Sequence, residues 1–117
     1  MQLVAIRIFV DDLTAARRFY QETLGLPLAW DEEDSLGFDV GGNLIVESVP
    51  RSAKAEDRAL VGRFVGCSLE VNNVEKACKA LSAKGVVFTG PPERQPWGGT
   101  LAHFKDPSGN ILTLVQI

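Results

Sequence analysis

One order of sequence patterns occurs twice in this chain of 117 residues, and the repetition restricts the possible folds more than any other feature. Each half begins with a β-branched run, at 3–10 and again at 64–71, whose alternating side chains indicate a strand. Each run leads to a helix-capping residue, Asp12 or Asn73, followed by apolar residues at helical spacing. Shorter strand patterns complete each half, so the repeating unit is a strand, a helix and further strands.

The two halves also close alike, because a Gly-Asn pair opens the last strand of each. With an offset of 67 residues, Gly42-Asn43 falls on Gly109-Asn110, and the third residue past the Asn is Val46 in one copy and Thr113 in the other. Two long copies do not make a solenoid. We therefore expect an α+β fold in which two tandem βαβββ modules form a curved mixed sheet around a shared cavity.

The modules are expected at 1–50 and 64–117, with a linker at 51–63 that is polar, charged and without periodicity. Prolines and glycines predict a loop without regular structure at 90–99. The other expected elements are strands at 26–30, 35–40, 43–49, 86–88, 100–105 and 110–116, and helices at 13–24 and from 74 to Gly85.

Composition excludes several classes of function. The net charge of −3 provides no basic stripe for nucleic acid. No apolar run approaches the roughly 20 residues that a membrane span needs, and the N-terminus does not have the pattern of a signal peptide. We therefore expect a cytoplasmic protein, with Cys67 and Cys78 reduced and packed in the interior.

Four features resemble the vicinal oxygen chelate superfamily, which contains glyoxalase I, extradiol dioxygenases, and fosfomycin and bleomycin resistance proteins. They are "VDDLTAARRFYQETLGL", "LEVNNVEKACKALSAKGV", "PWGGTLAHFKDPSGNILTLV" and the internal duplication. The resemblance covers nearly the whole chain and implies the fold with more specificity than the function, because one fold hosts many activities. It also implies a homodimer, since short relatives commonly complete their pockets between subunits.

Metal-dependent members of that superfamily take one ligand from the first strand and one from the last strand of each half. Carried over by the spacing, these positions are Ala5, Val46, Gly66 and Thr113. None has the imidazole or carboxylate that a divalent metal prefers, so we expect no metal and no cofactor. A register shift of one residue would bring Glu47 to the position of Val46, which alone would not make a site.

The remaining candidates are ligand-binding residues of the concave face. His103, the only histidine, is expected to face the cavity while Phe104 packs toward the helices; it would be a polar contact, a general base or an exposed residue without a role. Arg7 opposite Glu70 would form either a clamp for a charged ligand group or an internal salt bridge. Trp97 is expected as a lid or as packing at a dimer edge. The candidate set is Arg7, Phe9, Trp30, Phe38, Ser68, Glu70, Trp97 and His103.

These observations predict a metal-free protein that sequesters a drug-like or metabolite ligand, as the resemblance to bleomycin resistance proteins implies. The alternative is a lyase or isomerase of the glyoxalase or dioxygenase kind, either metal-dependent or using His103 or Glu70 as general base. A third possibility, a module that serves as a partner surface, predicts a filled cavity and an exposed apolar patch.

Overall fold

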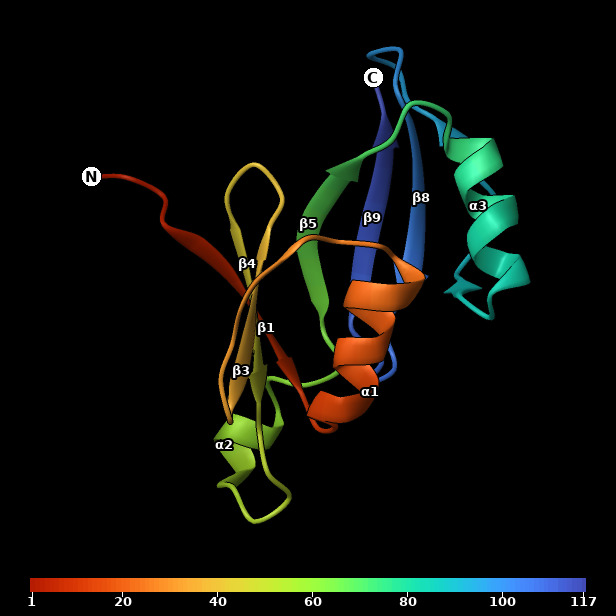
Figure 1. The fold of residues 1–117 in the computed structure, drawn as a ribbon. Coiled ribbons are helices and arrows are strands. Elements are labelled where there is room, and N and C mark those ends of the chain that lie inside the picture. The colour runs from red at the N-terminus through yellow and green to blue at the C-terminus, as the bar shows by residue number, and fades with distance from the viewer. The chain divides into compact units, whose positions relative to one another are not determined.

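The computed structural model describes residues 1–117, and the chain divides into two compact units (Figure 1). Unit 1 is Met1–Arg63 together with Pro107–Asn110. Unit 2 is Phe64–Asp106 together with Ile111–Ile117. The short segment Pro107–Asn110 therefore belongs to unit 1, although the strands on either side of it belong to unit 2.

The sheet of unit 1 has the strand order β1-β4-β3-β2. Its first and last strands pair in parallel, and the other neighbours pair antiparallel, as the βαβββ pattern requires. The strands are β1 (Ala5–Val10), β2 (Leu28–Asp31), β3 (Ser35–Asp39) and β4 (Asn43–Ser48).

The helix of unit 1 is not uniform. α1 (Leu13–Arg17) begins at the predicted cap, where the carboxylate of Asp12 accepts from the amide of Ala15 at 3.0 Å. It continues as the π-helical segment η1 (Arg18–Thr23), in which the Leu24 amide donates to the Phe19 carbonyl. The prediction of a single α-helix at 13–24 is therefore wrong from Arg18 to Thr23. The wider π turn lets the adjacent rings of Phe19 and Tyr20 both be buried.

One face of the unit 1 sheet is buried and the other is open. Tyr20 packs on Phe38 of β3, with the ring centroids 5.9 Å apart. The buried face is lined by alternate residues of three strands, which confirms the alternation predicted for the first strand: Ile8, Val10, Leu36, Phe38, Leu44 and Val46.

Unit 2 repeats the strand arrangement with the order β5-β9-β8-β6, and β7 pairs with β8. β5 pairs with β9 in parallel. The strands are β5 (Phe64–Glu70), β6 (Val87–Phe88), β7 (Glu93–Arg94), β8 (Thr100–Lys105) and β9 (Ile111–Gln116).

Helix α3 (Val74–Ala83) contacts β6, β8 and β9 (Figure 1). The side chain of Asn73 accepts from the Lys76 amide at 3.0 Å, so the predicted cap is confirmed. Phe104 is fully buried beside Phe88, on the face predicted to pack toward the helices. The other core residues of this unit are Cys67, Val74, Val86, Ala102, Leu112, Leu114 and Val115.

Two stretches expected to be irregular contain regular structure. The predicted linker holds the one-turn helix α2 (Ala55–Arg58), and Val61 forms an isolated bridge to Phe9. The proline-rich loop holds β7, because the turn at 95–99 reverses the chain: the Gln95 amide donates to the Gly99 carbonyl at 2.7 Å. A proline lacks only its own amide donor, so its neighbours are still able to pair.

The architecture is therefore the predicted α+β fold, with two curved, open mixed sheets and few helices. No helix is long and apolar enough to span a bilayer.

Candidate functional site

The open face of the unit 1 sheet carries Glu47, and Val46 points to the other side. Val46 pairs with Ile8 and Leu36, both buried, and is itself fully buried. Because neighbours on a strand face opposite sides, Glu47 lies on the open face with Phe9, its partner in register. The carry-over of a ligand position to Val46 is therefore wrong by one residue.

Arg7 and Glu47 form a bidentate ion pair on this face. Both Nε and Nη2 of Arg7 donate to the carboxylate, the latter at 3.1 Å. The hydrogen bond and the charge of Glu47 raise the pKa of the Arg7 guanidinium above its usual value. The guanidinium carbon also lies 5.2 Å from the centre of the Phe9 ring. The salt bridge that Arg7 forms is exposed rather than internal, and its acidic member is Glu47 rather than Glu70.

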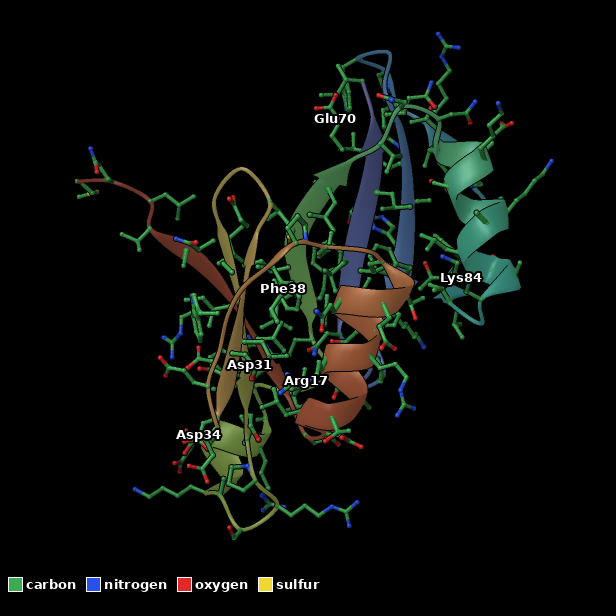
Figure 2. The ribbon with its side chains drawn as sticks, viewed as in Figure 1. Arg17, Asp31, Asp34, Phe38, Glu70 and Lys84 are labelled. Atoms are coloured by element: carbon green, nitrogen blue, oxygen red, sulfur yellow. The ribbon has the colours of Figure 1, made fainter.

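Trp30 joins the same sheet at its edge. It pairs with Gly37, and a Cβ at Gly37 would collide with the indole ring, which therefore lies over the glycine. Beside it, Arg17 of α1 and Asp31 of β2 point toward each other (Figure 2) and form a second bidentate ion pair. The strand end that holds Trp30 is thereby tied to the helix.

Phe38 occupies a different environment from these residues. It lies on β3 (Figure 2), with no exposed surface, on the buried face against Tyr20. Its ring is thus part of the unit 1 core.

A small pocket of about 170 Å³ opens beside Phe9 and Glu47. Both side chains contribute to its wall, together with the segment that follows β4 and with α2. The remaining wall residues are Ser48, Val49, Pro50, Ala53, Asp57 and Leu60. Residues of the predicted linker thus border the pocket, which polarity and lack of periodicity alone did not indicate.

The open face of unit 2 gathers His103, Thr113 and Ser68. Thr113 pairs with His103 across β8 and with Ser68 across β5. The Nδ1 atom of His103 lies 2.7 Å from the Thr113 hydroxyl, and Thr113 is buried while His103 is half-buried. The expected orientation of His103 away from the Phe104 side is confirmed. This hydrogen bond orients the imidazole and leaves Nε2 as its second polar atom.

An aromatic ring completes this neutral cluster. Phe64, at the start of β5, meets His103 edge to face with centroids 5.8 Å apart, and 62% of Phe64 is exposed. Sequence reasoning did not select Phe64. The relevant signal was its period-two spacing with Ser68 and Glu70 on one strand.

The last two candidates lie toward the ends of their elements. Glu70 is exposed at the end of β5 (Figure 2), two residues beyond Ser68 on the same face. Trp97 is 61% exposed, and its ring covers Gly99 in the turn before β8. Neither Glu70 nor Trp97 forms a hydrogen bond or a ring contact with His103.

The four positions that would hold a metal do not provide a suitable donor set. Ala5 and Gly66 have no side-chain donor, and the hydroxyl of Thr113 is bonded to His103. Gly66 also has φ of +59° at a register shift in β5, a conformation that residues other than glycine adopt uncommonly. Glu47 is the one strong donor, and Arg7 binds both its oxygens. No group of three or more His, Cys, Asp or Glu within either unit is arranged to hold a metal ion.

The two cysteines are free and unsuited to nucleophilic chemistry. Cys67 is buried on β5 and Cys78 is half-buried on α3. Burial raises the pKa of both thiols, and the charge of Glu75 adds to the effect at Cys78. The reactive thiolate is therefore disfavoured at both positions, as expected for packed cysteines.

Comparison with known proteins agrees with this geometry. The uncharacterized protein YraH of Bacillus subtilis (strain 168) is 31% identical over 128 residues, covering 100% of this chain and 99% of YraH. A member of the glyoxalase/bleomycin resistance protein/dioxygenase superfamily from Sphaerobacter thermophilus is 32% identical, with a TM-score of 0.81, over 100% of this chain and 98% of its own. TnmS3, an antibiotic-binding protein from Streptomyces sp. CB03234, is 28% identical with a TM-score of 0.74, over 99% and 95% of the two chains.

The family model described as Glyoxalase/Bleomycin resistance protein/Dioxygenase superfamily matches residues 2–114. The match spans nearly all of both units, and so includes both open faces. The chain therefore belongs to the glyoxalase/bleomycin resistance protein/dioxygenase superfamily.

Proposed function

We propose that this protein binds and sequesters a small planar organic molecule without using a metal, in the manner of an antibiotic-binding protein. The observation that carries the proposal is the donor set: Ala5 and Gly66 supply no ligand atom, and Glu47 is held by Arg7. A member of this superfamily with that donor set keeps the fold but has no arrangement for metal-assisted chemistry.

The chemistry of the open faces supports a flat, largely apolar ligand. Phe9 and Trp30 in unit 1, and Phe64 in unit 2, offer aromatic surface beside a few hydrogen-bonding groups. Burial of apolar area contributes about 25 cal/mol per Å² before the costs of association. The similarity to the Streptomyces antibiotic-binding protein favours a drug-like ligand over a charged metabolite.

Tryptophan fluorescence tests the proposal, with bleomycin and the planar polyphenol quercetin as probes. The variants Trp30→Phe and Trp97→Phe each leave one indole, so quenching is assigned to one position. We expect quenching with micromolar affinity for at least one probe, and a loss of about tenfold in Phe9→Ala. Absence of saturable quenching by both probes at 100 µM in both variants would count against sequestration.

His103 supports a second candidate function, a metal-free lyase or isomerase that uses this residue as general base. In the tautomer whose Nδ1–H donates to the Thr113 hydroxyl, Nε2 is the unprotonated ring atom that would accept a proton from a substrate. Glu70 on the same face is the other candidate base. The test is to incubate a bound probe with protein and follow its mass and its proton exchange in D₂O. Exchange that is lost in His103→Gln, with binding retained, would favour the enzyme.

The proposal includes a homodimer in the cytoplasm with no nucleic-acid partner. The exposed rings of Phe64 and Trp97 and the two free cysteines support these assignments. Sedimentation equilibrium at 10–100 µM tests the dimer, and a single species of 12.7 kDa would exclude it.

A further inference from the structure

A second pocket in unit 1 lies next to the one beside Phe9 and is lined by two arginines. Its volume is about 220 Å³, the volume of about seven waters at about 30 Å³ each. The two pockets share Val49 and Pro50 but differ in charge. Glu47 and Asp57 line the first, whereas the second is lined by Asp11, Val49, Pro50, Arg51, Arg58 and Val61.

The arginines of the second pocket have no partner. Arg51 follows Pro50, and Arg58 is the last residue of α2; neither forms an ion pair or a side-chain hydrogen bond. By contrast, Arg7 and Arg17 are both held by bidentate carboxylates. Two unpaired guanidinium groups beside a pocket with an apolar wall of Val49 and Val61 suit a planar or tetrahedral oxyanion, because each presents a fork of donors.

The charge distribution along the chain supports this reading. The segment 51–63 has four basic and two acidic side chains. The rest of this acidic chain has eight basic and thirteen acidic side chains. The segment that borders the pocket thus has a net charge of +2 in an otherwise acidic chain, and its field would attract an anion.

Asp11 adds a selective element. Its Oδ1 accepts from the Ser108 hydroxyl at 2.7 Å, and its amide donates back to that hydroxyl at 3.1 Å. The carboxylate is thereby fixed at the pocket wall. A bare anion is repelled by this charge, whereas a hydroxyl next to an anionic group would donate to it.

We propose that this pocket binds a small hydroxylated oxyanion, of the class of a polyol phosphate, through Arg51 and Arg58, with Asp11 accepting from a hydroxyl of the ligand. The site is separate from the open face to which the proposed function refers. Its test is therefore independent of any planar ligand.

The experiment is an amide NMR titration of the full chain with glycerol 3-phosphate at constant ionic strength. Inorganic phosphate and glycerol are the two control probes, each containing one part of the ligand chemistry. We expect saturable shifts around Asp11, Val49 and Val61, and at least about tenfold weaker binding in Arg51→Gln and Arg58→Gln. Because both side chains are exposed and unpaired, these variants are expected to fold like the parent.

Two comparisons make the outcome decisive. Arg63→Gln removes a charge from the same segment outside the pocket and is expected to retain full affinity. Asp11→Asn should reduce the preference for glycerol 3-phosphate over phosphate. Equal losses of affinity in the Arg51, Arg58 and Arg63 variants would mean that the segment attracts the anion through its net charge alone, and that the pocket does not bind it. No saturable shifts at 20 mM glycerol 3-phosphate would also overturn the proposal.

Discussion

The two Gly-Asn turns share their sequence but not their surroundings. Asn43 is exposed, and its amide makes one bond of 3.3 Å to the Val4 carbonyl near the N-terminus. Asn110 has no exposed surface, and its side chain makes three bonds. Its oxygen accepts from Gly62 and Arg63 at 2.9 and 3.1 Å, and its amide donates to the Phe9 carbonyl at 2.8 Å.

The difference teaches that a repeated motif does not have a repeated role. In one copy the exposed Asn43 begins β4, and in the other Asn110 joins the end of β1 to the segment before β5 within unit 1. The strands that follow the two Gly-Asn pairs also differ in the face of the sheet on which matched residues lie. The offset of 67 matches Val46 with Thr113, yet Val46 faces the core and Thr113 faces the open side.

The largest effect is expected from Asn110→Ala. Three part-buried hydrogen bonds are lost, and two amides and a carbonyl are left without this partner, so the free energy of unfolding should fall by about 3 kcal/mol. Asn43→Ala is the matched control and should cost less than about 1 kcal/mol. Urea unfolding followed by circular dichroism measures both. Equal losses would mean that the two turns contribute alike.

Next comes the contrast between Ala5 and Gly66, the first-strand positions of the two units. Gly66→Ala places a side chain at φ of +59° and should destabilise the protein by about 1–2 kcal/mol. The nearest atom to the added Cβ is 3.8 Å away, so crowding does not contribute. Ala5→Ser in regular strand should stay within about 0.5 kcal/mol. A neutral Gly66→Ala would show that the bulge relaxes easily.

A smaller effect is expected at the buried hydroxyl of unit 2. Thr113→Val keeps the shape but removes the bond to His103, which should lower stability by about 1 kcal/mol. The readout that distinguishes positioning from packing is the pair of ¹⁵N shifts of the His103 ring, which should move toward those of a free imidazole. Thr113→Ser retains the hydroxyl and should retain the shifts. Unchanged shifts in Thr113→Val would argue that Thr113 does not orient the imidazole.

The smallest effect is confined to alkaline pH and to unit 2, which contains both cysteines. Burial raises the pKa of the Cys67 thiol above the usual value of 9.0, so the unfolded chain loses this proton first as pH rises. Stability from this group is therefore complete below pH 9 and declines above it. Unfolding measured from pH 7 to 10.5 should show a shallower decline in Cys67→Ala, with Cys78→Ala as the comparison. Parallel curves for parent and Cys67→Ala would contradict this origin.

Much of the fold could be predicted because local signals agree with the tertiary arrangement. Asp12 and Asn73 each bond the predicted amide, and the alternation in β1 and β5 assigns most side chains to the correct face. The orientation of His103 follows from the same alternation, anchored by the burial of Phe104.

The rest depends on information that neighbouring residues do not contain. Whether Val46 or Glu47 faces outward depends on the register between β4 and β1, and a shift of one residue exchanges the faces. The partner of Arg7 is forty residues away in sequence, so spacing alone does not reveal it. Phe38 alternates with Leu36 on β3, but the pattern alone does not say which face of the sheet is covered, and the packing of Tyr20 assigns both to the core.

The contribution of Pro107–Asn110 to unit 1 has a consequence for synthesis on the ribosome. Residues 1–63 emerge first, but the partners of Asp11 and Phe9 in this unit lie 97 and 101 residues further along the chain. At about 5–20 residues per second, the nascent unit waits about 2–9 seconds for the segment that completes it. During that interval the end of β1 lacks these partners, and only a chain translated beyond Asn110 can supply them.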